Sequence, residues 1–273
     1  MKLKVFKSLW GMTGSLEDQF RQIADAGVYD GIETSMPTAE NEARFRALLA
    51  RHKLDYLPMV FSAGKTVQEH AASFREDLQR ALTFAPAVIN AHGGKDWFSA
   101  EEQAQFAAAA LEATQELATP NGVLVAHETH RGRMMFTPAN TAKLLRQFPD
   151  LRLNADFSHW CCVCESLLED QPTAMKLACE RSVHIHGRVG HPEGPQVSDP
   201  RAPEFADAVA KHFGWWDAIV EAQRAAGRSV MTFTPEFGPP AYMPALPYTR
   251  QPVADLWDIC MYMTQQFRSR FSA

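Results

Sequence analysis

Hydrophobic and polar positions follow one repeating pattern along the whole chain. Short runs of β-branched and apolar residues alternate with longer segments in which apolar residues recur every three or four positions. The first pattern predicts buried strands and the second predicts amphipathic helices. The predicted strands are Leu3–Ser8, Tyr29–Glu33, Asp55–Phe61, Ala87–Ala91, Gly122–Glu128, Leu151–Asp156, Ser182–Arg188 and Ser229–Glu236. The predicted helices are Leu16–Ala26, Asn41–Arg51, Thr66–Thr83, Ala100–Ala118, Pro138–Gln147, Glu204–Ala226 and Val253–Phe267.

Strands that alternate with helices imply βαβ units and a parallel sheet. Eight strands in a chain of 273 residues fit a closed (β/α)8 TIM barrel better than an open sheet. No linker or low-complexity tract divides the sequence, so we expect one domain over residues 1–273. The alternative is a doubly wound dinucleotide-binding sheet, which requires GxGxxG after its first strand. The sequence at that place, Trp10–Ser15, lacks the third glycine.

Acidic and histidine residues gather at the ends of the later predicted strands. The inward phase of a barrel places Glu128, Asp156, His186 and Glu236 at the ends of four consecutive strands. Burying a carboxylate costs free energy unless its negative charge is compensated. A bound cation can compensate it, and so can an ion pair with an arginine such as Arg188. Three carboxylates and one imidazole form an oxygen-rich set, so we predict one bound divalent metal. Mn²⁺ is the first choice, and Mg²⁺, Co²⁺ and Zn²⁺ are the alternatives.

A second group of residues lies at or just beyond the same strand ends and is predicted to bind substrate: Trp10, Glu33, His92, His130 and Arg188. Trp10 is expected to stack on a sugar ring, with core packing as the alternative. Arg188 is expected to bind a carboxylate or phosphate, with a structural ion pair as the alternative. The predicted rim holds four arginines, which favours an anionic substrate: Arg131, Arg133, Arg188 and Arg201.

Composition excludes some classes of binding partner and favours one cellular compartment. The chain has 27 Lys and Arg against 32 Asp and Glu, a net charge of −5. This charge argues against a nucleic-acid or membrane-surface binder, because both targets are polyanionic. No apolar run approaches the ~18 residues of a transmembrane helix. The five cysteines form neither a disulfide framework nor paired zinc ligands, which favours the cytoplasm and gives Cys161, Cys162 and Cys164 no predicted role beyond packing.

Five motifs occur in order along the chain: Asn90–Gly94 with Asp96, His127–Arg131, Asp156–Trp160, His184–His186 and Thr234–Gly238. Together they resemble the xylose-isomerase-like TIM barrel superfamily, in particular its sugar phosphate isomerase/epimerase branch. The resemblance implies that Glu128, Asp156, His186 and Glu236 are the metal ligands. It also implies that Glu128 and Glu236 exchange protons with the substrate, and that His159 hydrogen-bonds a substrate oxygen.

The resemblance therefore implies a metal-dependent isomerase or epimerase that acts on a small carbohydrate through an enediolate. The segment 187–196 departs from the keto-hexose epimerases, which carry a further Glu and an Asn-Arg pair there. A metal-dependent lyase or dehydratase on a keto-sugar or keto-cyclitol fits the same ligands. The abasic-site endonucleases of the superfamily are disfavoured, because they need a third-strand histidine that is missing from Leu57–Phe61. Members of the superfamily commonly associate, so a homo-oligomer is also compatible with the resemblance.

Overall fold

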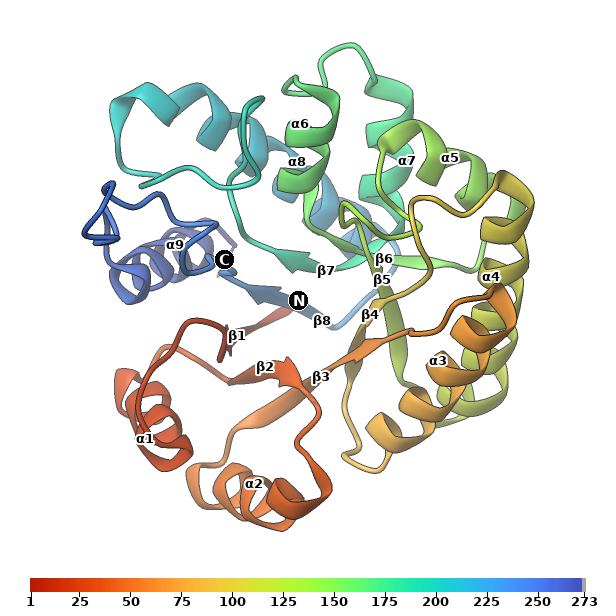
Figure 1. Ribbon diagram of the computed structural model, residues 1–273, viewed down its shortest axis with the longest axis horizontal. Coiled ribbons are helices and arrows are strands. Elements are labelled where there is room, and N and C mark those ends of the chain that lie inside the picture. The colour runs from red at the N-terminus through yellow and green to blue at the C-terminus, as the bar shows by residue number, and fades with distance from the viewer. Residues whose placement is uncertain (272–273) are drawn as a thin grey trace.

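The computed structural model describes residues 1–271 and shows a closed barrel of eight parallel strands with helices around it (Figure 1). The strands are β1 (Lys2–Ser8), β2 (Gly31–Ser35), β3 (Asp55–Phe61), β4 (Val88–His92), β5 (Leu124–Glu128), β6 (Arg152–Ala155), β7 (Ser182–His186) and β8 (Val230–Thr234). Each strand pairs with the next in sequence, and β8 closes the ring by pairing in parallel with β1. The predicted (β/α)8 TIM barrel is confirmed.

The outer layer consists of α1 (Leu16–Ala26), α2 (Ala39–His52), α3 (Val67–Leu82), α4 (Ala100–Ala113), α5 (Pro138–Gln147), α6 (Phe157–Cys164), α7 (Pro172–Arg181), α8 (Ala206–Ala225) and α9 (Leu256–Phe271), with short helical turns at Thr114–Ala118, Thr119–Asn121 and Pro203–Phe205. Side-chain caps fix where several of them begin. Thr66 and Ser99 each form a reciprocal capping box with a glutamate three residues later. Such a cap satisfies backbone N–H groups that a helix leaves unpaired in its first turn. Within the described part of the chain, no helix has the length and apolar character needed to cross a bilayer.

Two helices between the sixth and seventh strands, α6 and α7, were not predicted from the sequence. The first half of α6 is buried on all sides, since Phe157 to Cys161 are all inaccessible. A helix that is buried all round shows no polar face, so its sequence lacks the amphipathic period used for prediction. The sixth, seventh and eighth strands also end one or two residues earlier than predicted. Asp156, Arg188 and Glu236 therefore lie just beyond the ends of these strands.

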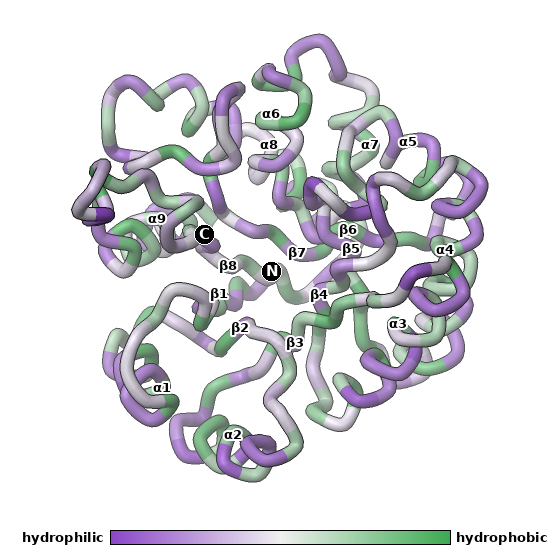
Figure 2. The backbone as a smooth tube through the Cα atoms, in the orientation of Figure 1, coloured by the Kyte–Doolittle hydropathy of each residue, from purple (hydrophilic) through white to green (hydrophobic). Residues whose placement is uncertain are grey.

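The hydrophobic core lies mainly between the barrel and the helices, and hydrophobic residues occur along both the strands and the surrounding helices (Figure 2). The barrel interior has two layers instead of one continuous apolar filling. A small cluster of Phe6, Leu57, Val88, Ala126 and Val183 occupies one level. Two residues further along the strands, the inward positions become polar, as in Asn90 and Glu128. The strands therefore carry buried polar groups at their carboxyl ends, where TIM barrels place their active sites.

Candidate metal centre

The four predicted metal ligands converge at the carboxyl end of the barrel. Glu128 and His186 are the last residues of β5 and β7, and Asp156 and Glu236 lie just after β6 and β8. All four are buried, and one possible ligand atom from each lies within 4.8 Å of those of the others. The Nδ1 atom of His186 is 3.1 Å from Glu236 Oε2, 3.5 Å from Glu128 Oε2 and 3.9 Å from Asp156 Oδ2.

The donor set fits a divalent cation. Among residues 1–271, neither Glu128 Oε1 nor His186 Nδ1 has a hydrogen-bond partner, although both atoms are buried. An unsatisfied buried polar atom costs about 1–3 kcal/mol, and binding of a cation removes that cost. Three carboxylates with one imidazole match the ligand preference of Mn²⁺ and related ions.

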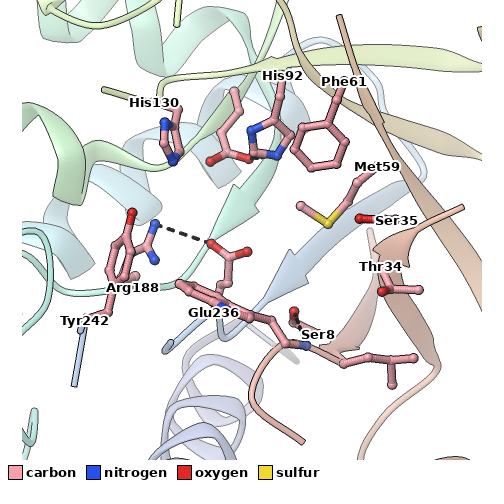
Figure 3. Close-up of a pocket in the computed structure, with 13 residues that line it drawn as sticks. Ser8, Thr34, Ser35, Met59, Phe61, His92, His130, Arg188, Glu236 and Tyr242 are labelled. Atoms are coloured by element: carbon pink, nitrogen blue, oxygen red, sulfur yellow. Dashed lines mark hydrogen bonds and ion pairs between the residues drawn. The ribbon is translucent and has the colours of Figure 1, made fainter. Parts of the chain in front are cut away.

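Arg188 lies directly against this cluster and is only 1% exposed. Its guanidinium pairs with Asp156. It also lies 3.3 Å from Glu236 Oε2, the contact marked by the dashed line in Figure 3. Its Nε donates to Ser158 Oγ at 3.1 Å, and its Nη2 donates to His159 Nε2 at 2.8 Å. Burial raises the pKa of Asp156 to about 6, an effect that the arginine opposes. The cluster of carboxylates thus has one built-in positive counter-charge.

A cavity of about 390 Å³ opens beside the ligand cluster (Figure 3). Glu128, Glu236 and Arg188 form its polar end. Hydroxyl, apolar and aromatic side chains form the rest of its wall: Ser8, Thr34, Ser35, Leu9, Met59, Phe61, Trp10 and Tyr242, together with His92 and His130. A wall of this composition suits a small polyol with one apolar face.

Four of the five predicted substrate-binding residues line this cavity: Trp10, His92, His130 and Arg188. The ring of Trp10 meets that of Tyr242 edge-on, with centroids 4.9 Å apart. Gly238 lies against the same indole so closely that a Cβ there would be 2.1 Å from it. Trp10 is therefore held in place by the loop after β8.

The fifth predicted residue, Glu33, lies outside the cavity wall. It is fully buried at the level of His184 and His186. Burial raises the pKa of its carboxyl group, but His186 and His184 outweigh this effect and hold the pKa below its usual value. Side-chain phase indicates that a residue points inward, but it does not indicate the depth, which is why the sequence placed Glu33 against the substrate.

His159, which the resemblance predicts to hydrogen-bond a substrate oxygen, is also fully buried and lies behind the cavity wall. Its ring centroid is 3.9 Å from that of His130, and its Nε2 accepts from Arg188. It therefore contacts two residues of the wall, His130 and Arg188.

The charge states of the wall residues differ. Burial raises the pKa of Glu128, but His92 and His186 reverse this effect and leave the pKa well below its usual value. His92 Nε2 lies 2.8 Å from Glu128 Oε2 and its ring stacks on Phe61. Burial lowers the pKa of His130 to about 4. Near neutral pH the cavity therefore presents an ionised glutamate beside a neutral imidazole, a combination suited to proton transfer.

The predicted group of four rim arginines does not converge on the cavity. Arg201 pairs with Asp199 and Asp258 on the surface. Arg131 and Arg133 lie over the outer parts of the wall, 5.2 Å from the Tyr242 ring centroid and 5.8 Å from that of Phe61. Arg188 is the member of the group that lines the cavity.

Sequence reasoning missed several wall residues, of which Tyr242 is the most prominent. It belongs to the long connection between β8 and α9, where no periodic pattern indicates which side chains turn inward. Ser8 and Ser35 end β1 and β2, so their position at strand ends was the available signal. Gln196, also missed, fixes this connection: its amide accepts from Gly238 N at 2.7 Å and donates to Gly238 O at 3.1 Å.

Comparisons with known proteins agree with this architecture. The family model described as xylose isomerase-like TIM barrel matches residues 20–238. A probable 3-DHS dehydratase from Bacillus anthracis is a similar solved structure, with 15% identity, a TM-score of 0.62, and coverage of 98% of this chain and 100% of that chain. A 3-keto-D-glucoside 4-epimerase from E. coli gives the same values. The IolI protein with a bound zinc atom has 16% identity and a TM-score of 0.62, with both chains covered completely. No curated protein matches the sequence significantly.

Proposed function

This chain belongs to the xylose isomerase-like TIM barrel family, and we propose that it is a divalent-metal-dependent sugar isomerase or epimerase. Its substrate would be a small sugar, sugar acid or sugar phosphate with a carbonyl group. The observation that carries the proposal is the convergence of Glu128, Asp156, His186 and Glu236 at one end of a cavity. Two of these four, Glu128 and Glu236, also form part of the cavity wall.

The four ligands would hold the metal, with Mn²⁺ as the first choice. A divalent ion bound there supplies Lewis acidity that polarises a substrate carbonyl and acidifies the adjacent C–H bond. Glu128 and Glu236 approach the cavity from different strands, so one carboxylate can take a proton from one face of the substrate while the other returns a proton. Trp10 and Tyr242 would bind the apolar face of the sugar, and the hydroxyls of Ser8 and Ser35 would bind its oxygens.

His130 and His159 would orient the substrate and its neighbours. The Nδ1 atom of His130 contacts the carbonyl oxygen of Arg131, so Nδ1 carries the proton and Nε2 is free to accept. His130 can therefore accept a hydrogen bond from a substrate hydroxyl. His159 is proposed to support this position from behind, through its contacts with His130 and Arg188.

A metal-dependent lyase acting on a keto-sugar or keto-cyclitol is the second candidate. An elimination needs a group to protonate the leaving oxygen in addition to the base that removes the C–H proton. Glu128 and Glu236 both line the cavity and would divide these two roles between them, and a probable 3-DHS dehydratase is among the similar solved structures.

Two measurements test the proposal. Metal analysis of the purified protein should find one divalent ion per chain, and Asp156→Asn should lose most of it. Incubation with keto-sugars, sugar acids, their phosphates and inositol ketones in D₂O with Mn²⁺ should place deuterium next to the carbonyl of a substrate. Loss of one water from the same compound would identify a lyase. Equal metal content in wild type and Asp156→Asn would contradict the proposed site, and cleavage of an abasic oligonucleotide would indicate a DNA-repair enzyme instead.

A further inference from the structure

The carboxylate of Glu33 lies on the Nε2 side of the His186 ring, opposite the other three proposed ligands, and has polar neighbours at both oxygens. Its Oε1 is 2.8 Å from His186 Nε2 and 3.0 Å from Asn90 Nδ2. Its Oε2 is 3.1 Å from His184 Nε2 and also accepts from the Thr234 hydroxyl. Four neighbouring side chains thus direct donors at one fully buried carboxylate.

These contacts determine how His186 presents its ring. An ionised carboxylate accepts hydrogen bonds and cannot donate them, so the Nε2 atom that faces Glu33 must carry a proton. The opposite nitrogen, Nδ1, then faces Glu236, Glu128 and Asp156 at 3.1 to 3.9 Å. In the described part of the chain this Nδ1 has no hydrogen-bond partner. The ring is therefore oriented with one nitrogen bound to Glu33 and the other available to the ligand cluster.

Glu33 is too tightly bonded to act as a ligand of a separate ion. Glu33, His184 and His186 offer ligand atoms within 4.8 Å of one another. Each Glu33 oxygen, however, already faces two donors, which are His186 and Asn90 at Oε1 and His184 and Thr234 at Oε2, so we assign no separate ion to it. It does not contact the cavity either, where the wall near β2 begins at Thr34 and Ser35.

We propose that Glu33 is a positioning residue for the metal ligand His186, and that its carboxylate fixes the ring orientation and thereby sets metal affinity. The inference rests on the proposed function, because it assigns His186 to the metal. Metal-bound histidines generally donate their second ring N–H to a carboxylate, carbonyl or water, and loss of that partner typically weakens metal binding by 10–100-fold.

Asn90 extends this support to a second ligand. Its Nδ2 group donates to Glu33 Oε1 at 3.0 Å and to Glu128 Oε2 at 2.8 Å. One amide therefore ties the carboxylate behind His186 to the carboxylate of Glu128, so that β2, β4, β5 and β7 hold the two ligands in a common frame.

The test compares Mn²⁺ binding, measured by calorimetric titration, in the wild type, Glu33→Gln and Thr232→Val. The substituted amide has the same shape as the carboxylate but one acceptor oxygen for two histidines, so we expect affinity to fall by about 10–100-fold. Thr232 is a matched control, because it is equally buried and its hydroxyl contacts His184 Nδ1 at 2.8 Å rather than His186. Thr232→Val should bind Mn²⁺ like the wild type. A folded Glu33→Gln protein with wild-type affinity would overturn the proposal.

A second readout needs no metal. In NMR spectra of ¹⁵N-labelled metal-free protein, the Nε2–H proton of His186 should give a signal that exchanges slowly with solvent. The signal is assigned to His186 by its absence in His186→Gln. It should also disappear in Glu33→Gln. Failure of the wild type to bind Mn²⁺ would refute the proposed function, and this signal would still decide the role of Glu33. Rapid exchange in the wild type would overturn that role. If Glu33→Gln does not fold, both measurements are made on Glu33→Asp instead. This variant keeps the negative charge, but its side chain is one methylene shorter, so the carboxylate lies farther from His186.

Discussion

Glu236 has two proposed roles in the centre, metal binding and proton transfer, and one substitution can separate them. It is a proposed metal ligand and also part of the cavity wall. In Glu236→Gln the amide oxygen can still coordinate a metal, but the amide is not a base. We expect partial metal retention and a loss of about 10²–10⁴-fold in the rate of proton transfer, measured as deuterium incorporation from D₂O. Near-wild-type exchange would assign the base to another residue.

Arg188 is expected to act on the ligands more than on the charge of the substrate. The sequence predicts that Arg188→Met raises KM for an acidic substrate alone. In the structure the guanidinium is bound to both Asp156 and Glu236, and its loss leaves two buried carboxylates without their counter-charge. We therefore expect Arg188→Met to impair turnover of acidic and neutral substrates alike.

Arg201→Met is the matched control, because Arg201 pairs on the surface with Asp199 and Asp258. Steady-state kinetics on an acidic substrate and its neutral analogue would check both variants. A selective effect of Arg188→Met on the acidic substrate would restore the interpretation that Arg188 recognises an anion.

At the level of single residues, alternation along a strand predicts which side chains face into the barrel. Glu128, Asp156, His186 and Glu236 share an inward phase on four neighbouring strands, and the structure brings them together. Phase does not encode depth, which is why Glu33 was expected in the cavity. The role of His159 came from the family resemblance, and its burial behind the wall could not be inferred from that motif. Alternation also says nothing about loops, and Tyr242 was missed for that reason.

At the scale of elements, the contact between α8 and the loop after β7 depends on one neutral histidine. His212 donates from Nδ1 to Ala208 O within α8 and accepts from Gly190 N at its Nε2. Burial lowers its pKa from 6.5 to about 4. Between these two values the unfolded chain binds the proton and the folded chain does not, so stability falls as pH decreases through this window.

The expected result is a decrease in the free energy of unfolding between pH 7 and pH 4, to which His212 contributes up to about 3 kcal/mol. His212→Gln cannot titrate and should show a shallower dependence on pH, measured by urea unfolding at several pH values. An unchanged slope would mean that other groups, such as His127, whose pKa burial also lowers to about 4, dominate the acid sensitivity.

Helices were predictable where one face is polar and the other apolar, because most of them pack one face on the core. The strands were predictable from short apolar runs, since strands such as β4 and β7 are buried on both faces. Helix α6 was not predictable in this way, since its first turns are enclosed by protein on all sides. The strands ended earlier than predicted because side-chain phase continues past the last interstrand hydrogen bond, as at Glu236.

At the scale of the whole molecule, closure of the barrel forces four carboxylates into one buried region. Glu33, Glu128, Asp156 and Glu236 face Arg188 and the histidines of β4 and β7. Burial lowers the pKa of His186, but Glu236, Glu33 and Glu128 outweigh it and hold that pKa well above its usual value. The excess of negative charge therefore favours a proton on His186, and a divalent cation bound by the four ligands would replace that proton at Nδ1 and offset the charge more fully.

Metal binding should consequently stabilise the entire fold. A ligand that binds only the folded state adds about 2.7 kcal/mol at a free concentration 100 times its Kd, which corresponds to several degrees in the Tm of a chain of this size. We expect Mn²⁺ to raise the Tm of the wild type in calorimetry, and a chelator to reverse the increase. Asp156→Asn should show a much smaller response, because one of the four ligands has lost its charge. An equal rise in both proteins would mean that Mn²⁺ stabilises the chain from somewhere other than the end of the barrel.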